Sequence, residues 1–578
     1  MATTTATLPT TKGGGFLLEA ATPENVFTPE DFTEEHRDIA RATDEFFRKE
    51  VEPNLEAIQH QEPGVAVGIL KKSAELGLTA VVVPEQYGGM GMDLTSAMIV
   101  AEQLARDGSY SGWHGAHSGI GTLPLLLFGT EEQKQKYLPR LASAELVGAY
   151  CLSEPQAGSD AMNIQTRADL SEDGTHYVLN GQKMWITNGG GADLYTVFAK
   201  IGGEQFSAFL VERAWPGVSP GAEEKKMGIK GSSTTAVYLD NVKVPKENLL
   251  GEIGRGHIIA FNILNLGRLK LGPGTVGGCK NLIAVSLKYA KERKAFGKSI
   301  AEFGMIQHKL AEMAIRTFAS ETMSYRVSGL IESHIESDEP ASVMKAAEEF
   351  AAECSYVKVF ASETLDYVSD EGVQIHGGYG YHQDYVVERA YRDSRINRIF
   401  EGTNEINRML ATGMLLKRAQ KGRLGLVEAV KALQGEILSG PTPGLSAVEG
   451  AKKAALLALG IAYQKYLTDL ENQQEILAAI TDIAMNAFAM ESVELRSKKL
   501  AASGKGENAA DMCAVFLDEA MEMVASAART VLAACSEGDA LRTNLAILRR
   551  FTKNDAVDTV ALRRRIAARL LAAEKYIV

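Results

Sequence analysis

The spacing of apolar residues changes character along the chain and divides it into segments. Over residues 31–141 apolar residues recur at helical spacing. Near Val147 the pattern changes to short apolar runs separated by turn residues, which predicts strands. Helical spacing returns over 257–423 and again over 446–578. The sequence therefore predicts one β region set between helical regions.

Several short runs carry the strand prediction. The dipeptide Asn180–Gly181 is typical of a tight hairpin turn, so we expect a hairpin between the two runs that flank it. The predicted strands lie at 150–155, 177–181, 183–188, 194–198, 207–211 and 236–239.

These changes give a domain organisation. A Thr- and Gly-rich start predicts a loosely ordered arm, and a Pro/Gly-rich stretch at 438–444 predicts a linker. The predicted units are a flexible arm (1–27), an N-terminal helical domain (28–147), a middle β domain (148–255), a C-terminal helical-bundle domain (256–425) and a helical extension (446–578).

Composition narrows the class of protein. Apolar residues make up 45% and charged residues 23% of the 578 residues, as in globular proteins. The net charge of −12 argues against a nucleic-acid partner, because phosphate binding needs basic surface. Five scattered cysteines predict neither a disulfide framework nor a metal site. We see no run of about 18 apolar residues and no targeting segment, so a cytoplasmic protein is expected.

One stretch carries candidate chemistry. Glu401 follows the apolar pair Ile399–Phe400 and precedes Gly402, and then Thr403 and Asn404, which are both good N-cap residues. Glu401 is thus predicted to lie on a tight turn where a helix begins. Partial burial raises the pKa of a carboxyl group and a helix N-terminus lowers it, so this group could act as a base sensitive to water exclusion. The same residues also fit an ordinary capping turn.

Other motifs point away from common chemistries. Residues 272–277 match G-x-G-x-x-G literally, but they lie within helical periodicity and lack a preceding strand. We therefore expect small residues at a helix crossing. No P-loop, H-E-x-x-H, G-x-S-x-G or clustered His/Cys set occurs, and no metal is expected.

The stretch R-I-x-R-I-F-E-G-T-N-E-I at 395–406 resembles the segment of the acyl-CoA dehydrogenase family that carries its catalytic glutamate, here Glu401. Four further stretches resemble flavin-binding segments of that family, in its order and spacing: 150–160, 185–187, 291–298 and 374–380. The resemblance implies FAD as cofactor. The implied FAD-binding residues are Tyr150, Leu152, Ser153, Gly158, Ser159, Trp185, Ile186, Thr187, Arg293, Phe296, Gln307, Gln374, Gly377, Gly378, Thr403 and Asn404.

The resemblance also implies a substrate site. Residues 264–268 resemble the helix that receives the CoA end of the ligand, and some members carry their base there, one residue before the arginine. This chain has Gly267 at that position, which leaves Glu401 as the candidate. The implied substrate-binding residues are Ser159, Asn265, Arg268 and Gly402.

The implied fold class is α+β, mostly α: a helical domain, a β domain and a four-helix bundle, with an additional C-terminal helical domain as in the very-long-chain subgroup. The implied reaction is α,β-dehydrogenation of a long-chain acyl-CoA to the trans-2-enoyl-CoA. Glu401 would remove the α-proton, and electrons would pass from FAD to an electron-transferring flavoprotein. A homodimer is expected, because residues of two subunits would bind each FAD.

Several alternatives stay open. The enzyme could be an acyl-CoA oxidase that uses oxygen, or a flavoprotein of this fold that acts as a scaffold. The extension, with its basic end at 563–569, could add a packing layer, cover the dimer or touch an anionic membrane. Four glycines could empty the far end of an acyl pocket or merely let helices approach: Gly112, Gly115, Gly119 and Gly121.

Overall fold

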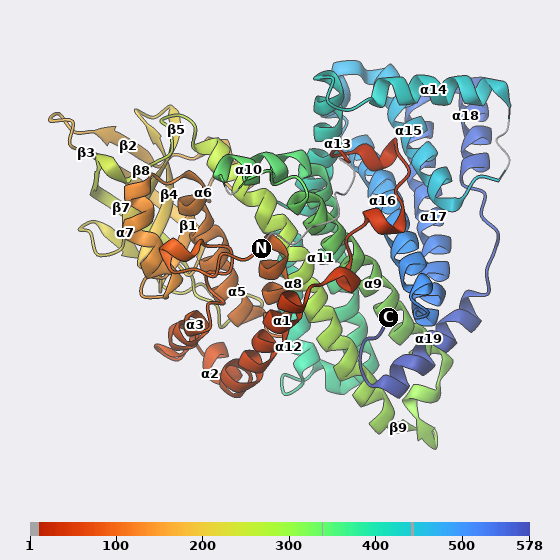
Figure 1. Ribbon diagram of the computed structural model, residues 1–578, viewed down its shortest axis with the longest axis horizontal. Helices are drawn as coiled ribbons and strands as arrows, with labels where there is room; N and C mark the ends of the chain where they lie inside the picture. The colour runs from red at the N-terminus through yellow and green to blue at the C-terminus, as the bar shows by residue number, and fades with distance from the viewer. Residues whose placement is uncertain (1–10, 338, 441–443) are drawn as a thin grey trace.

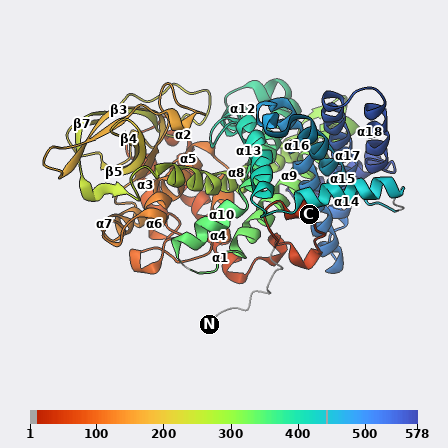
Figure 2. The ribbon, with the colours of Figure 1, turned by 90° about the horizontal axis from the view of Figure 1, so that it is seen from above.

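The molecule is arranged along one long axis, with the β-sheet near one end and the last helices of the chain at the other (Figure 1). Figure 2 shows the same order from above, with the long helices α8 and α9 between the two ends. This computed structural model describes residues 11–337, 339–440 and 444–578. Part of the predicted arm (1–10) and part of the predicted linker (441–443) lie outside the described residues.

The N-terminal region is helical, as the periodicity predicts. The helix Glu131–Ala142 begins with a capping box, in which the backbone N–H of Gln133 donates to Thr130 Oγ1 and the Thr130 N–H donates to Gln133 Oε1. The helices are α1 (Glu34–Phe46), α2 (Leu55–Gln59), α3 (Val65–Glu75), α4 (Leu94–Leu104), α5 (Gly108–Ala116), α6 (Leu123–Phe128) and α7 (Glu131–Ala142). A π-helical turn, η7 (His117–Gly121), joins α5 to α6.

The middle region forms a mostly antiparallel sheet in the order β6-β7-β3-β2-β4-β5-β8, with β1 paired in parallel to β4. Its inward side chains form a core that includes Val197, Phe209 and Val237. The strands are β1 (Gly148–Cys151), β2 (Arg167–Leu170), β3 (His176–Thr187), β4 (Leu194–Ile201), β5 (Gln205–Glu212), β6 (Val218–Pro220), β7 (Thr234–Pro245) and β8 (Leu249–Leu250).

The hairpin predicted at Asn180–Gly181 is wrong. These residues lie inside β3, which continues to Thr187 along β7 with a shift of register between Leu179 and Gly181. A side chain at Gly181 would place its Cβ 2.5 Å from Oγ1 of Thr166. The glycine is therefore required by the close approach of a neighbouring chain segment at a bulge, where glycine is also common.

Four long helices form the central bundle: α8 (Gly256–Glu292), α9 (Gly304–Glu332), α11 (Ala351–His376) and α13 (Asn404–Gln420). The helix crossing predicted from the 272–277 glycines is confirmed, because a Cβ at Gly277 would lie 1.9 Å from the backbone oxygen of Glu102 on α4. Shorter elements complete the region: β9 (Lys294–Ala295), β10 (Lys298–Ser299), α10 (Pro340–Glu349) and α12 (Val386–Ser394).

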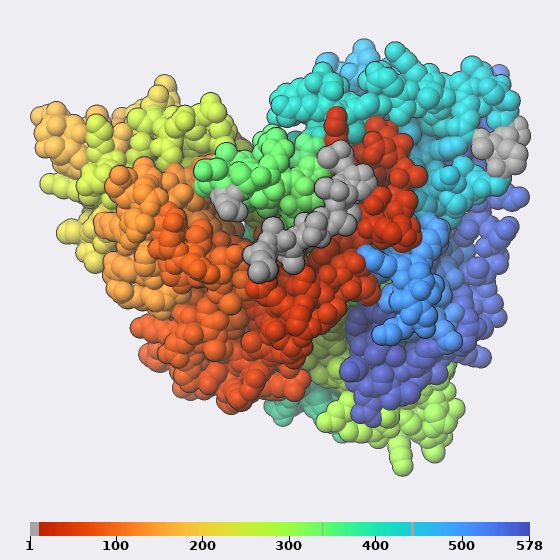
Figure 3. All heavy atoms as spheres, viewed as in Figure 1, coloured from red at the N-terminus to blue at the C-terminus, as the bar shows by residue number. Residues whose placement is uncertain are grey.

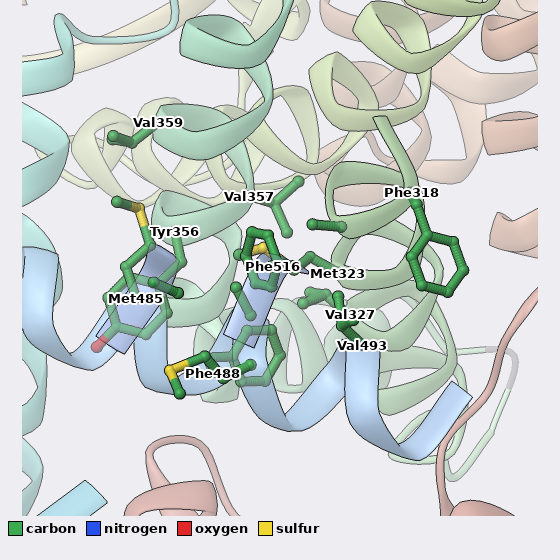
Figure 4. Packing of buried hydrophobic residues seen from close by; sticks show 14 of the residues in the cluster. Phe318, Met323, Val327, Tyr356, Val357, Val359, Met485, Phe488, Val493 and Phe516 are labelled. Atoms are coloured by element: carbon green, nitrogen blue, oxygen red, sulfur yellow. The ribbon is translucent and has the colours of Figure 1, made fainter. Parts of the chain in front are cut away.

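The last part of the chain packs against this bundle as a further helical layer. Figure 4 shows side chains of α9, α11, α16 and α17 meeting in a shared hydrophobic core, among them Phe318, Tyr356, Phe488 and Phe516. The helices are α14 (Leu426–Ser439), α15 (Ala447–Tyr466), α16 (Gln474–Ala502), α17 (Glu507–Cys535), α18 (Gly538–Phe551) and α19 (Thr559–Ala573).

The predicted loosely ordered arm is wrong for residues 11–27. They follow the surface between the N-terminal helices and the last helices of the chain (Figure 3). Gly15–Leu17 form a 3₁₀ turn whose Phe16 is buried and packs edge-on against Tyr356 and Phe488. The backbone N–H of Gly14 donates to Glu353 on α11. One buried aromatic ring and a few hydrogen bonds thus hold a segment whose composition resembles a tail.

Buried ion pairs join these layers. Arg496 on α16 donates to Glu321 on α9 at 2.6 Å and to Glu30 near the N-terminus at 2.8 Å. The basic end is also used internally, because Arg563 donates to Glu312 at 2.7 Å and Arg565 donates to Asp511 at 2.6 Å. The extension is therefore tied to the bundle by charge as well as by apolar contact.

The described residues contain one long apolar helix, no cluster arranged to hold a metal ion and no disulfide. The helix Gln474–Ala502 passes a length and composition test for crossing a membrane, but 83% of its most apolar window is buried in the protein. No group of three or more His, Cys, Asp or Glu side chains in the described part of the chain is arranged to hold a metal ion. All five cysteines are free.

Candidate active site

Glu401 lies beside a cavity of about 780 Å³ between the N-terminal helices, the sheet and the central bundle. Its Oε2 atom is buried and has no hydrogen-bond partner among the described residues. Burial raises the pKa of Glu401 to about 7, while the nearby cations Arg268 and Lys358 limit the rise. The result is a carboxylate with a free oxygen and a proton affinity near neutrality.

The turn that presents Glu401 has an uncommon backbone. Glu401 has a φ of 57°, in the left-handed region that L-residues with a side chain rarely adopt, and Gly402 follows at 80°. Thr403 then caps α13 by accepting a hydrogen bond from the N–H of Ile406. The predicted capped turn before a helix is confirmed. Strained backbone of this kind is typical of functional sites.

Gly267 faces the carboxylate directly. A Cβ at this position would lie 2.7 Å from Oε2 of Glu401, so any side chain there would displace the carboxylate. Position 267 is therefore a glycine in a place where the Glu401 carboxylate occupies the space that a side chain would need. A carboxylate carried on α8 at residue 267 would point to the same place.

Two predicted substrate residues hold the Glu401 turn instead of facing the cavity. Arg268 Nε donates to the backbone oxygen of Glu401 at 3.1 Å, and its Nη1 donates to Oδ1 of Asn265 at 2.9 Å. Both side chains are buried, and neither is among the residues that line the cavity. A buried guanidinium needs acceptors inside the fold, and the turn supplies them. Arg268 and Asn265 thus support the turn, and their predicted contact with the CoA end of a ligand stays a prediction.

A residue that the sequence analysis missed completes this support. Lys358 on α11 is fully buried, and its Nζ donates to the backbone oxygen of Gly402 at 2.8 Å and to Oδ1 of Asn404 at 2.6 Å. The side-chain nitrogen of Asn404 donates to Ser362 and Glu363, so that side chain is fully used inside the fold. The predicted cofactor contact of Asn404 stays a prediction.

The predicted flavin residues of the sheet lie near the cavity and at the adjoining surface. Thr187 lines the cavity that Glu401 also lines. Trp185 is 56% exposed and has a φ of 59°, while Ile186 between them is buried. Tyr150 on β1 and Leu152 just after this strand are buried in the core, and Ser153 is half-buried. Gly158 and Ser159 are exposed, and a Cβ at Gly158 would meet nothing within 4 Å.

Three other predicted flavin residues, Arg293, Gly377 and Gly378, line a separate hollow of about 510 Å³. Gln374 is exposed at the end of α11, and the Gln307 side chain donates to the backbone oxygen of Ala301. Phe296 is 95% exposed. In Figure 1 the neighbouring strand β9 lies at the opposite end of the molecule from the sheet. A single chain therefore does not bring the two groups of predicted flavin residues together.

The four glycines of the pocket prediction differ in role. Gly112, Gly115 and Gly119 line the cavity, whereas Gly121 packs on β1, where its Cβ would lie 2.7 Å from the backbone of Gly148. A Cβ at Gly115 would meet nothing within 4 Å. Gly115 therefore leaves room in the cavity, and Gly121 lets two chain segments approach closely.

The chain matches four family profiles in order. They are the acyl-CoA dehydrogenase N-terminal domain at 33–145, the middle domain at 149–242, and two profiles described as the acyl-CoA dehydrogenase C-terminal domain, at 254–415 and 450–550.

The chain belongs to the acyl-CoA dehydrogenase family. The predicted family, fold class and enzyme class are thus confirmed, including the additional helical domain at the C-terminal end.

Known acyl-CoA dehydrogenases are similar in sequence to this chain over most of its length. A probable acyl-CoA dehydrogenase of Bacillus subtilis is 49% identical over 98% of both chains. The human very long-chain specific acyl-CoA dehydrogenase, mitochondrial, is 38% identical and matches 74% of this chain and 70% of its own length. A crystal structure of acyl-CoA dehydrogenase complexed with FAD from Bacillus anthracis, at 48% identity, superposes with a TM-score of 0.97 over 98% of this chain and 100% of that chain.

Lys358 yields a prediction about the pH dependence of the site. Burial lowers the pKa of Lys358 itself to about 7, and in its charged form the ammonium lowers the pKa of Glu401, so Lys358→Met should raise the pKa of Glu401. A base works in its deprotonated form, so the acid limb of kcat/KM against pH should move to higher pH. The wild-type limb is expected near pH 7.

The matched control is Lys417→Met, an exposed lysine on α13 with no described side-chain partner, which should leave the limb in place. A Lys358→Met enzyme that folds and keeps the wild-type pH profile would show that the lysine is merely structural.

Proposed function

We propose that this protein oxidises long-chain acyl-CoA thioesters to trans-2-enoyl-CoA, with Glu401 as the base that removes the α-proton. The observation that carries the proposal is the buried, unpartnered Oε2 of Glu401 beside a large cavity. A cavity of this volume lies within the usual range for small-molecule sites. Family membership supports the reaction class.

The residues present fit FAD. Exposed Gly158, Gly377 and Gly378 leave open space where backbone N–H groups can approach a cofactor. Thr187 lines the cavity beside Glu401, and exposed Trp185 offers a flat ring for packing. Bound FAD supplies the acceptor for the β-hydrogen, which leaves the substrate as hydride.

The turn itself offers what proton removal requires. The α-proton of a thioester is too weakly acidic for a free carboxylate, so the developing enolate oxygen needs positioned donors. No described residue accepts a hydrogen bond from the backbone N–H of Glu401, which leaves that donor available. As the acyl chain displaces water, Glu401 loses solvation and becomes a stronger base. Arg268, Lys358 and Asn407 meanwhile hold the carbonyls of the turn.

The shape of the cavity supports a long acyl chain. Its lining on α8 runs from Ile263 to Leu282, about 28 Å of helix at 1.5 Å per residue. Gly115 leaves additional room in the wall. The similarity to the human very long-chain enzyme agrees with this choice.

The electron acceptor is proposed to be an electron-transferring flavoprotein, because the family resemblance implies one. An acyl-CoA oxidase would instead consume oxygen with acyl-CoA as the sole other substrate, and an oxygen electrode separates the two. A scaffold role is disfavoured by the intact arrangement around Glu401.

The proposal includes a homodimer. Arg293 directly precedes β9, which lies in Figure 1 at the opposite end of the molecule from β3, the strand that carries Trp185, and this supports a shared FAD site of which a second copy would supply one half. A membrane contact through the extension is not part of the proposal, because Arg563, Arg565 and Arg569 are paired with carboxylates of the chain itself.

Replacing the base tests the function directly. Glu401→Gln should keep FAD and still bind acyl-CoA, yet lose turnover by about 10²–10⁴, the usual contribution of a general base. Stopped-flow reduction of the flavin by palmitoyl-CoA measures this step. Near-normal reduction by the variant would refute the assignment of Glu401.

Gly115 tests the chain-length proposal. Gly115→Leu should shift the preferred substrate to shorter chains, since four carbons excluded from the pocket cost about 3 kcal/mol, or about a hundredfold in kcat/KM. The control is Gly413→Leu, an exposed helical glycine on α13 that also faces open space. A parent enzyme that already prefers substrates of four to eight carbons, from butyryl-CoA up to octanoyl-CoA, would contradict the long-chain proposal.

Arg293 tests the shared cofactor site. A charge-assisted contact is worth about 1.5–3 kcal/mol, so Arg293→Ala should weaken FAD binding by about tenfold or more and lower the melting temperature. The control is Arg529→Ala, an exposed arginine with no described ion pair. Unchanged flavin occupancy and melting temperature would make Arg293 a plain surface charge.

A further inference from the structure

An ammonium group lies in the wall of the cavity. Lys270 is on α8, three residues beyond Gly267, and lines the same cavity as Glu401. Its Nζ donates to Oγ of Ser118 at 2.9 Å. The Ser118 hydroxyl in turn donates to the backbone oxygen of His114 at 2.8 Å, so its own hydrogen is already used.

The hydrogen-bond donors of Lys270 are not exhausted. A lysine ammonium has three donors, and Ser118 takes one. Within the part of the chain that the structure describes, no carboxylate lies within 4.0 Å of Nζ and no second acceptor is recorded for it. Two N–H groups are therefore left for something else in the cavity.

The surroundings do not neutralise this charge. Burial lowers the pKa of His114 far below its ordinary value and that of His117 to about 4, so both rings are neutral. His117 is also satisfied, since its ring nitrogens meet the backbone oxygen of Leu141 and the backbone N–H of Gly148. Burial likewise lowers the pKa of Lys270, to about 8, with no carboxylate to oppose it.

Other buried or half-buried lysines of this chain have acceptors that match them. Lys183 pairs with Glu154 at 2.7 Å, Lys280 pairs with Glu102 at 2.6 Å, and Lys358 has two oxygen acceptors. An ammonium removed from water without such a partner is costly. Lys270 departs from this pattern, and it does so in the wall of the cavity.

There is also room for a ligand group at the ammonium. A Cβ at Gly119 would lie 3.6 Å from Nζ of Lys270, so the glycine leaves that side of the amine open. Gly115, one helical turn away, faces open space. The wall at this point is thus a cation with free donors, bordered by two residues without side chains.

We propose that Lys270 binds a carboxylate at the distal end of the acyl chain, so that the substrates of this enzyme include dicarboxylyl-CoA thioesters. The inference rests on the proposed function. A carboxylate offers two oxygens to the two free N–H groups and supplies the missing counter-charge. A wholly apolar chain offers neither.

The position of Lys270 predicts a length optimum. Three residues along α8 advance about 4.5 Å beyond the point opposite Glu401, and the lysine side chain adds its own reach. A chain must extend several bonds past the reacting carbons before its carboxylate meets Nζ. We therefore expect activity on dicarboxylyl-CoAs to rise to a maximum at intermediate length.

The test uses the FAD-loaded enzyme and matched pairs: adipyl-, suberyl-, sebacyl- and dodecanedioyl-CoA against hexanoyl-, octanoyl-, decanoyl- and lauroyl-CoA. For the best dicarboxylyl substrate, Lys270→Met should lower kcat/KM by about tenfold or more, the loss of one charge-assisted contact. The same variant should keep or raise activity on the monocarboxylyl partner. Lys270→Gln, which can still donate to Ser118, should show the same two effects as Lys270→Met. The control Lys421→Met, at an exposed lysine, should change activity on neither the dicarboxylyl nor the monocarboxylyl substrate.

Two results would overturn the inference: wild-type enzyme that turns over no dicarboxylyl-CoA, or a Lys270 variant that loses activity equally on both members of a pair. Neither result would contradict the proposed function if monocarboxylyl-CoAs still reduce the flavin. Conversely, normal flavin reduction by the Glu401→Gln enzyme would refute the assignment of Glu401 as the base, independently of what Lys270 binds. The wild-type comparison needs no variant and stands even if a substitution impairs folding.

Discussion

The candidate site depends on one carboxylate kept away from water without a direct ionic partner. Two cations lie close to Glu401, yet the recorded hydrogen bonds of Arg268 and Lys358 go to backbone oxygens of its turn and to amide side chains. A direct ion pair would lower the carboxyl pKa and occupy its oxygens. Here the cations fix the turn and only moderate the effect of burial, so the pKa stays near 7 and Oε2 stays free.

The rest of the fold can be understood as support for that turn. Lys358 is carried by α11, which packs in the shared core with α9 and α16, and Phe16 of the N-terminal segment closes against Tyr356 on the same helix. The extension and residues 11–27 thus lie behind the helix that holds the base. Their buried ion pairs, such as Arg496 with Glu321 and Glu30, fix the layers relative to one another. Breaking such pairs is costly because it leaves buried charge uncompensated.

Much of this could be predicted from the sequence, where the signal is local or belongs to a family pattern. The sequence alone predicted the change from helical to strand periodicity, the capped turn at Thr403 and the family. Contacts distant in sequence were not: nothing near Lys358 shows that it meets Gly402, 44 residues later. Asn180–Gly181 carries a local hairpin signal, but pairing with β7 converts it into a bulge. Gly115 and Gly121 look equivalent in sequence, and only the fold shows that one faces a cavity and the other a strand.

Burial gives Glu401 a proton affinity near neutrality, and the ionisation of this carboxyl group can be followed directly. Difference infrared spectroscopy of the FAD-loaded enzyme, with Glu401→Gln as the reference, isolates the carbonyl stretch of the protonated carboxyl group as pH is varied. We expect a band that disappears with a midpoint near pH 7 and is missing in the variant. A carboxyl group that ionises near its ordinary pKa of 4.5 would contradict it.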